Sequence, residues 1–194
     1  MIPGIIASMQ PAVGGGGPVV YDTFTDTGYP NISAHTPDTA PGGSSWGGYT
    51  PATYVVSDSA GHFLNTGAIK NNGPIIDSGL SDCVITLFVK AVTLTNHQGI
   101  VFRNTATTDV LPSWGVRALS ASFILREGTT LRASQSGTFG AGNENMVVTL
   151  NGTSIQATFM GATLNYTSAT NQTVTTHGPK PGVNGVDNFT VEAL

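Results

Sequence analysis

The residues that could carry out acid–base chemistry are few and far apart in this sequence. The chain has only three glutamates, at positions 127, 144 and 192, and each stands alone. Glycoside hydrolysis needs two carboxyl groups that face one sugar ring, one as the acid and the other as the nucleophile or base. No Glu-x-Asp-x-Glu cluster or similar pattern supplies such a pair. We therefore interpret Glu127, Glu144 and Glu192 as isolated surface carboxylates and predict that the protein is not an enzyme.

Four histidines, at positions 35, 62, 97 and 177, are the next candidates for catalysis or metal binding. His35 and Asp38, in SAHTPDT, could supply two members of a catalytic triad, but no nucleophile motif accompanies them. We expect His35 to order a polar loop through hydrogen bonds instead. Zinc needs three or four ligands at workable spacing, and no pair of histidines here provides the start of such a set. The sequence thus predicts no cofactor and no zinc.

Calcium is a separate alternative, because it binds carboxylate and carbonyl oxygens from loops. Four aspartates lie in or near expected loops: Asp26, Asp38, Asp58 and Asp187. No EF-hand pattern appears, and the sequence alone does not bring these residues together. Aspartate is also a common turn former. We favour the turn interpretation and leave a structural calcium ion open.

Two tryptophans could stack on sugar rings or fill the core. Trp46 and Tyr49 lie in GGSSWGGY, where glycines on both sides would leave the indole ring accessible. We favour a core or rim role for Trp46 and Trp114, because aromatic side chains dominate core burial. Trp46 and Tyr49 stay candidate glycan contacts. The single cysteine, Cys83, excludes an internal disulfide and is expected to be a small buried apolar residue.

The composition excludes several classes of partner. Charged residues make up 9% of the chain and the net charge is −4, with no basic cluster. Nucleic-acid binding needs lysine and arginine gathered on one face, and a membrane-surface helix needs a similar basic face. No apolar run approaches the ~18 residues of a transmembrane helix. We predict no nucleic-acid binding and no membrane insertion.

The first 18 residues form a distinct arm. Proline and glycine disfavour a stable helix there, and Gly14–Gly17 form a flexible tether. The arm lacks the basic start of a signal peptide. A disordered leader and an uncleaved targeting remnant are the alternatives. We favour an anchor that buries apolar residues in a partner subunit, through Ile2, Pro3, Ile5, Ile6 and Met9.

Residues 19–194 read as one all-β domain. The run CVITLFVKAV (83–92) predicts a long central strand with Ile85, Leu87 and Val89 on one face. Asn151-Gly152 and Glu127-Gly128 each lie between two alternating runs and predict hairpin turns. Residues 186–194 predict a last strand, with Phe189, Val191 and Ala193 on one face. No amphipathic pattern of ten residues or more indicates a helix, so we expect an antiparallel two-sheet sandwich.

An ordered set of stretches carries a family resemblance over about residues 22–194. These are YDTFTDT (21–27), SAHTPDT (33–39), SSWGGY (44–49), DSGLSDCVITLFVKA (77–91), QGIVFRNT (98–105), SWGVRAL (113–119), FILREGTTLRASQSG (123–137), MVVTLNGTSIQATF (146–159) and VDNFTVEAL. The domain resembles the concanavalin A-like, or laminin-G-like, jelly rolls of bacteriophage virion proteins. The resemblance implies that the first and last strands pair, that Phe24 and Phe189 enter the core, and that the arm leaves beside the C-terminus.

Because this fold hosts many functions, the resemblance gives only an expectation about function. We expect a non-enzymatic virion structural protein on the outside of the particle, in capsid decoration, a collar or a tail. Its arm would bind another virion protein, and several copies would associate as a homo-oligomer. The alternative is a lectin-like domain that binds surface glycans. A degenerate glycoside hydrolase is a third, which the scattered carboxylates disfavour.

Overall fold

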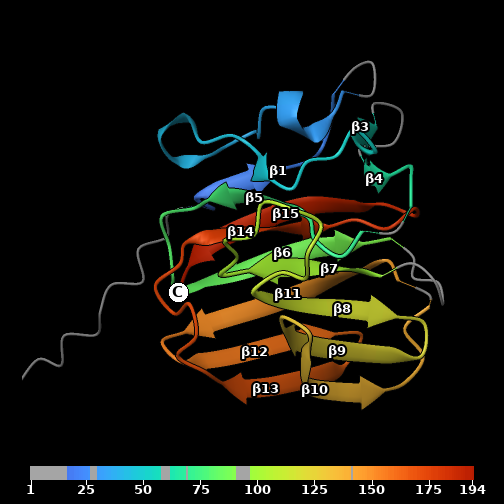
Figure 1. Cartoon of the computed structure of the whole chain (residues 1–194), viewed down its shortest axis with the longest axis vertical. Helices are drawn as coiled ribbons and strands as arrows, with labels where there is room; N and C mark the ends of the chain where they lie inside the picture. Colours follow the sequence, from blue (N-terminus) through green and yellow to red (C-terminus); the bar gives the residue numbers. More distant parts are fainter. Residues whose placement is uncertain (1–16, 27–29, 58–61, 69, 91–96, 141) are drawn as a thin grey trace, which may run out of the picture.

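The computed structural model describes residues 17–26, 30–57, 62–68, 70–90, 97–140 and 142–194 (Figure 1). Within them the chain is 51% strand and 4% helix, arranged as two antiparallel sheets of eight and seven strands. The predicted all-β, two-sheet sandwich is therefore confirmed, and the fold is jelly-roll-like. The proposed anchor residues, 2, 3, 5, 6 and 9, and Asp58 lie outside the described residues.

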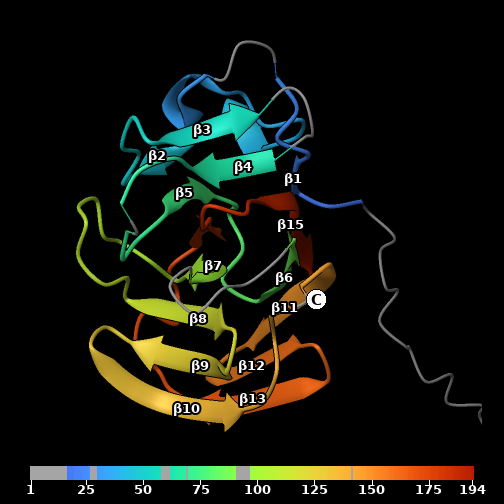
Figure 2. The same cartoon turned by 90° about the vertical axis from the view of Figure 1, so that its right-hand side faces the viewer.

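The larger sheet has the strand order β13-β12-β11-β6-β15-β4-β3, and β1 also pairs with β15. Figure 2 shows β11, β12 and β13 behind the strands of the other sheet in the lower half of the molecule. The strands are β1 (Val20–Asp22), β3 (Tyr54–Ser57), β4 (His62–Asn65), β6 (Cys83–Val89), β11 (Glu144–Asn151), β12 (Ser154–Phe159), β13 (Ala162–Thr167) and β15 (Val186–Ala193).

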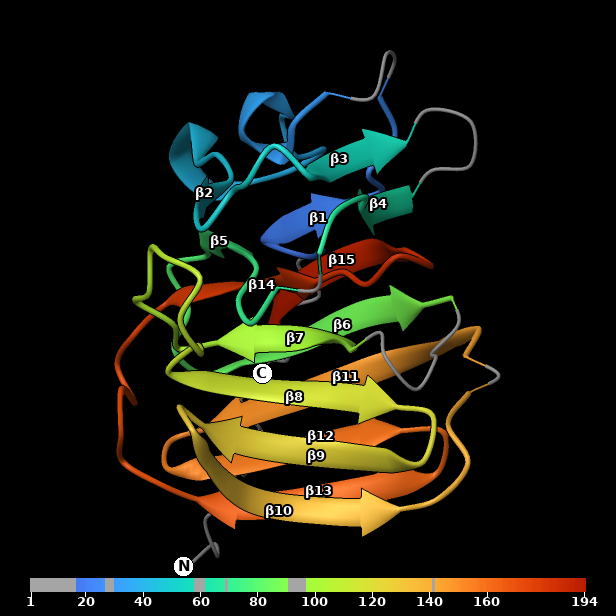
Figure 3. The same cartoon turned by 45° about the vertical axis from the view of Figure 1, so that its right-hand side comes forward.

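The smaller sheet has the order β10-β9-β8-β7-β14-β5-β2 and faces the larger sheet across the core (Figure 3). Two short 3₁₀ helices, η1 and η2, lie between β1 and β2. The elements are η1 (Ile32–Ala34), η2 (Pro41–Gly43), β2 (Gly47–Gly48), β5 (Pro74–Asp77), β7 (Gln98–Phe102), β8 (Trp114–Leu119), β9 (Ser122–Glu127), β10 (Thr130–Ser136) and β14 (Thr176–Lys180). The part of the chain that the structure describes contains no helix with the length and apolar character needed to cross a membrane.

Strand β6 is the central strand that the sequence predicts. It pairs with β11 on one side and β15 on the other, and Ile85, Leu87 and Val89 are fully buried. Val84 and Phe88 on its other face are only half-buried, in line with the alternation of a strand that has one face on the core. The strand ends at Val89, earlier than the predicted residue 92, and residues 91–96 lie outside the described residues.

Both predicted hairpins form, but each turn begins one residue later than predicted. Asn151 pairs with Ser154, so the two loop residues are Gly152 and Thr153. Gly152 has a φ of +54°, and Gly128 has a φ of +53° in the hairpin between β9 and β10. Glycine takes the first loop position because that position needs a positive φ in a type II′ turn. Asn151 is therefore the last residue of β11 and pairs with Ser154 of β12.

The pairing of the first and last strands, which the resemblance implied, is present. Val20 pairs with Val191 and Asp22 with Phe189, and Phe24 and Phe189 are both fully buried. The register between β15 and β6 shifts between Asp187 and Thr190, which marks a β-bulge that brings both Val186 and Phe189 to the core face. Ala193 was expected on that face too, but it is exposed at the strand end.

The strands of the smaller sheet approach each other closely at glycines. A Cβ atom added at Gly178 would lie 1.8 Å from the carbonyl oxygen of Pro74, and one at Gly99 would lie 1.9 Å from that of Val116. Because both obstacles are backbone atoms of neighbouring strands, no side-chain movement could relieve these contacts. These two positions therefore require glycine.

We predict that Gly178→Ala lowers the free energy of unfolding by more than the ~1–3 kcal/mol of ordinary overpacking. Urea denaturation measures this. Gly47→Ala is the matched control, because a Cβ there meets nothing within 4 Å and the residue has no positive φ. Equal stability of the two variants would show that the backbone of this sheet yields easily.

Candidate functional site

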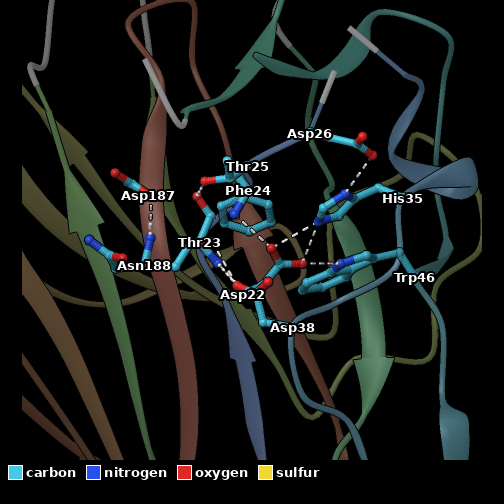
Figure 4. Close-up of polar contacts among 10 residues, drawn as sticks. All are labelled: Asp22, Thr23, Phe24, Thr25, Asp26, His35, Asp38, Trp46, Asp187 and Asn188. Carbon is cyan, nitrogen blue, oxygen red and sulfur yellow. Dashed lines mark hydrogen bonds and ion pairs between the residues drawn. The ribbon is translucent and has the colours of Figure 1, made fainter. Parts of the chain in front are cut away.

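The centre of the candidate site is the carboxylate of Asp22, at the end of β1 (Figure 4). The side chain is fully buried and accepts hydrogen bonds from three other groups. The backbone N–H of Phe24 lies 2.7 Å from Oδ1, the indole N–H of Trp46 lies 2.7 Å from Oδ2, and Nε2 of His35 lies 2.9 Å from Oδ1. We call Asp22, Asp26, His35 and Trp46 the Asp22 cluster. It joins β1 to the segment that carries η1 and η2.

His35 lies between two carboxylates. Its Nε2 faces Asp22, and its Nδ1 faces Oδ2 of Asp26 at 3.3 Å. Burial of the ring would lower the pKa of His35, but hydrogen bonds and attraction from Asp22 and Asp26 outweigh it and raise the pKa above 6.5. His35 thus orders a polar loop by hydrogen bonds, as the sequence predicts. Its partners, however, are not the Asp38 of its own motif.

Asp38 instead binds the segment that follows β1. Its Oδ2 accepts hydrogen bonds from the backbone N–H and the hydroxyl of Thr23, at 2.8 and 2.7 Å. The suggested His35–Asp38 pair is therefore wrong, because Asp38 is used at Thr23. Asp187 accepts a hydrogen bond from the N–H of Asn188 and lies 3.9 Å from Lys90. Among the described residues, no three His, Cys, Asp or Glu side chains are grouped to hold a metal ion.

Trp46 is not available to a sugar. Its side chain is 3% exposed, and its ring packs against Phe24 and Phe189 with centroid distances of 5.9 and 5.6 Å. The expectation that flanking glycines leave the ring accessible is wrong, because the bond to Asp22 draws the indole into the core. Tyr49 is half-buried and meets Tyr54 edge-on at 6.2 Å.

Sequence reasoning missed a second buried cluster, formed by Cys83, Arg103 and His177. The sulfur of Cys83 lies 3.7 Å from Nε2 of His177. That nitrogen also lies 2.9 Å from the carbonyl oxygen of Leu80, and Nδ1 accepts a hydrogen bond from the backbone N–H of Arg103 at 3.3 Å. Nε2 therefore carries the proton, since a carbonyl only accepts. Cys83 and His177 are 94 positions apart in the sequence, so only the fold brings them together.

This thiol–imidazole pair is not set up for nucleophilic catalysis. Burial raises the pKa of Cys83 to about 12 and lowers the pKa of His177 to about 4. A reactive cysteine needs the opposite shift, toward a thiolate at neutral pH. Both imidazole nitrogens are also occupied by backbone groups. The pair is therefore a core contact, which agrees with the predicted buried role of Cys83.

Arg103 ties together loops at this end of the sandwich. Its side chain is fully buried, and Nη2 donates to the carbonyl oxygens of Gly152 and Ser81 at 2.8 and 3.2 Å. Asp82 adds an ion pair at 3.4 Å. The N–H of Gly152 donates to the same Asp82 at 2.9 Å. Arg103 and Asp82 together fix the β11–β12 turn.

A third network covers the outer face of β14, β7 and β8 in the smaller sheet. Asn72 is fully buried, donates to the carbonyl oxygens of residues 106 and 108, and accepts from the side chain of Asn104 at 3.0 Å. Asn104 in turn accepts from the backbone N–H groups of residues 106 and 113. The two asparagines hold the segment around Asn72 and the 104–113 loop over β14, β7 and β8. The outer face of these strands is thus closed.

Two cations are buried beneath this cover. Lys180 donates to the carbonyl oxygen of His97 at 3.0 Å, and Arg117 donates to that of Asn71 at 2.6 Å. Burial, and then repulsion from Arg117, lowers the pKa of Lys180 to about 7. Burial also lowers the pKa of Arg117 to about 10. Both side chains are at most 5% exposed, so they do not present a basic surface to an anionic partner.

The three glutamates do not meet. Glu127 forms an ion pair with Arg132 at 2.6 Å, and Glu144 and Glu192 are exposed on other strands. Trp114 is fully buried and donates to the carbonyl oxygen of Thr170, so the core role favoured for it is confirmed.

Comparison with protein-family models and with curated proteins finds no match to this chain. Among the described residues, the buried polar cluster at the start of the domain is formed by Asp22, Asp26, His35 and Trp46, and it includes none of the glutamates.

Asp22→Ala is predicted to lower the free energy of unfolding by about 3–5 kcal/mol, because it leaves buried donors and the His35 cation without their acceptor. Chemical denaturation measures the loss. Asp187→Asn, a half-buried carboxylate next to the same strand pair, is the control and should cost less than about 1 kcal/mol. A similar small loss for both variants would contradict the central role of Asp22.

Cys83 should be unreactive in the folded protein. We predict that a thiol reagent such as dithionitrobenzoate labels it only as fast as the protein unfolds at pH 8, and at once in denaturant. The burial of the thiol and its raised pKa are the reasons. Rapid, stoichiometric labelling of the native protein would show that the thiol is accessible and reactive.

Proposed function

We propose that the chain is a non-enzymatic structural protein of a bacteriophage particle, attached through residues 1–18 and exposing its sandwich on the outside. The observation that carries the proposal is the way the first strand is fixed. Residues 17 and 18 lead directly into β1, whose N-terminal neighbour Val19 donates to the carbonyl of Val191 at 2.9 Å. Three residues later Asp22 holds the strand in the core. A force on the arm would therefore act on the body through a buried, multiply bonded strand.

The rest of the body supports a passive role. The histidines, the thiol and the buried cations of the described residues bond to neighbouring protein groups or are desolvated. The outer face of β14, β7 and β8 is covered by the segment around Asn72 and the 104–113 loop. A body of this kind is suited to stabilising or decorating a surface. The proposal includes the association of several copies as a homo-oligomer.

The energetics of the arm favour a preformed partner site. Each isoleucine that becomes buried contributes ~1.5–3 kcal/mol. Ordering the arm costs ~1–2 kcal/mol per residue in backbone entropy. The balance is marginal for one copy on an open surface. It becomes favourable where a pocket already exists and many copies attach to one particle.

The main observation that favoured the lectin-like alternative does not hold. It depended on an accessible Trp46 ring, and that ring is buried against Phe24 and Phe189. Tyr49 alone, half-buried, does not make a sugar platform. We therefore propose no second function.

Deletion of residues 1–18 tests the proposal. We expect the truncated protein to fold but to be missing from density-purified particles of the phage that encodes it, as measured by quantitative mass spectrometry. Ile6→Asp should reduce incorporation roughly tenfold or more, since it removes a buried apolar side chain and introduces a charge. Ser8→Asp adds the same charge at a polar position and serves as the control.

Normal incorporation of the truncated protein would show that the arm is not the anchor. Absence of the wild-type protein from the particles would overturn the virion assignment itself.

A further inference from the structure

The cations of this chain are few, yet several of them converge on one place. The chain has only seven lysines and arginines and a net charge of −4. Burial, and then repulsion from Lys180, Arg117 and Arg126, lowers the pKa of His97 to about 4. His97 itself is therefore neutral at pH 7. Three of the seven cations thus gather positive charge around one point on the outer face of the smaller sheet.

The strand register places two of these cations on either side of a glycine. Lys180 of β14 pairs with Gly99 of β7, and Gly99 pairs in turn with Arg117 of β8. Residues that lie directly opposite each other on neighbouring strands point to the same face of a sheet. Because glycine has no side chain, no side chain of β7 stands between Lys180 and Arg117 in this row.

The hydrogen bonds of Lys180 and Arg117 use only part of their donor capacity. Lys180 donates to the carbonyl oxygen of His97 at 3.0 Å, and Arg117 donates to that of Asn71 at 2.6 Å. An ammonium group has three N–H donors and a guanidinium group has five. No carboxylate of the described residues forms an ion pair with either cation. Asp109 acts on Lys180 only from an exposed loop position, where its Oδ1 accepts the N–H of Asn71.

The burial of two like charges without an opposite charge is costly. Lys180 is 1% exposed and Arg117 is 5% exposed. A charge away from water needs an opposite charge and hydrogen bonds to compensate for its lost hydration. Burial and repulsion from Arg117 lower the pKa of Lys180 to about 7, so about half of the Lys180 side chains still carry the proton at pH 7. An anion between the two side chains would supply the opposite charge.

We propose that Lys180 and Arg117 bind one chloride-sized anion above Gly99, beneath the cover formed by the segment around Asn72 and the 104–113 loop. The ion accepts N–H groups that the carbonyl oxygens of residues 71 and 97 do not use. No pocket lies between the cover and the sheet in the described part of the chain, so the ligand is a monatomic ion rather than a phosphate or a carboxylate. The ion ties β14 to β8 within one molecule, and this inference is independent of the proposed function.

Thermal unfolding of the full chain at pH 6, where Lys180 is protonated, tests the site. Chloride replaces gluconate, which is too large to enter, at constant ionic strength. For a dissociation constant of about 10 mM, the midpoint should rise by about 4 °C or more between about 5 and about 500 mM chloride. Lys180→Met should abolish this rise, and it should fold, because an apolar side chain of similar volume is tolerated in place of a buried charge. Lys90→Met is the matched control, since it removes the same charge from a half-buried position directly after β6.

Crystals of the wild-type protein grown in bromide give a direct measurement. We expect an anomalous-scattering peak in hydrogen-bond contact with Nζ of Lys180 and the guanidinium of Arg117. The absence of a chloride effect in the wild-type protein, or an equal effect in Lys180→Met, would overturn the proposal. Bromide peaks only at other places on the protein would do the same. The bromide map needs no variant, so it decides the question even if Lys180→Met does not fold.

Discussion

The burial of one carboxylate, that of Asp22, determines how the first part of the chain folds. An ionised carboxylate away from water is costly unless its oxygens are fully hydrogen-bonded. Its donors come from the next turn of backbone, from the histidine after η1 and from the tryptophan before β2. These groups therefore hold β1, which pairs with β15, to the segment that carries η1 and η2. Phe24 follows with a φ of +49°, a conformation that the bond from its N–H to Asp22 helps to hold.

Other buried polar side chains also form hydrogen bonds that hold loops at different places in the sandwich. Arg103 and Asp82 fix the turn between β11 and β12, and Asn72 and Asn104 hold loops over the smaller sheet. In each case a side chain forms hydrogen bonds with backbone groups that are not paired within the sheets. This use of polar residues explains how a chain with so few charges can keep long loops ordered. It also explains why the described histidines, thiol and buried cations offer no reactive pair.

The regular parts of the fold were predictable because alternation is a local signal. The faces of β6 and the strands of the β11–β12 hairpin follow directly from their apolar spacing, and the pairing of β1 with β15 followed from the resemblance. The one-residue shift of both turns depended on which residue takes the positive φ, which the dipeptide pattern does not specify. The bulge in β15 came from its packing on β6 and could not be read from the run VDNFTVEAL.

The polar clusters were much less predictable. His35 was correctly expected to order a loop, but its partners, Asp22 and Asp26, were not identified, and Asp38, the nearest aspartate in sequence, bonds to Thr23 instead. Trp46 was favoured as a core or rim residue, but the bond that buries it, to a residue 24 positions away, could not be read from its flanking glycines. Cys83 and His177 meet across 94 residues. Such contacts depend on strand order, and an Asp, His or Trp in a loop carries no local signal of its partner.

Native-state hydrogen exchange tests the central claim most directly, namely that Asp22 fixes β1 to the body. The amides to follow are those of Val19 and Tyr21, which donate to Val191 and Thr39. We predict that they exchange about as slowly as the amides of β6, through global unfolding, and that Asp22→Asn speeds their exchange far more than that of β11. Fast exchange of these amides in the wild-type protein, while β6 stays protected, would contradict the account.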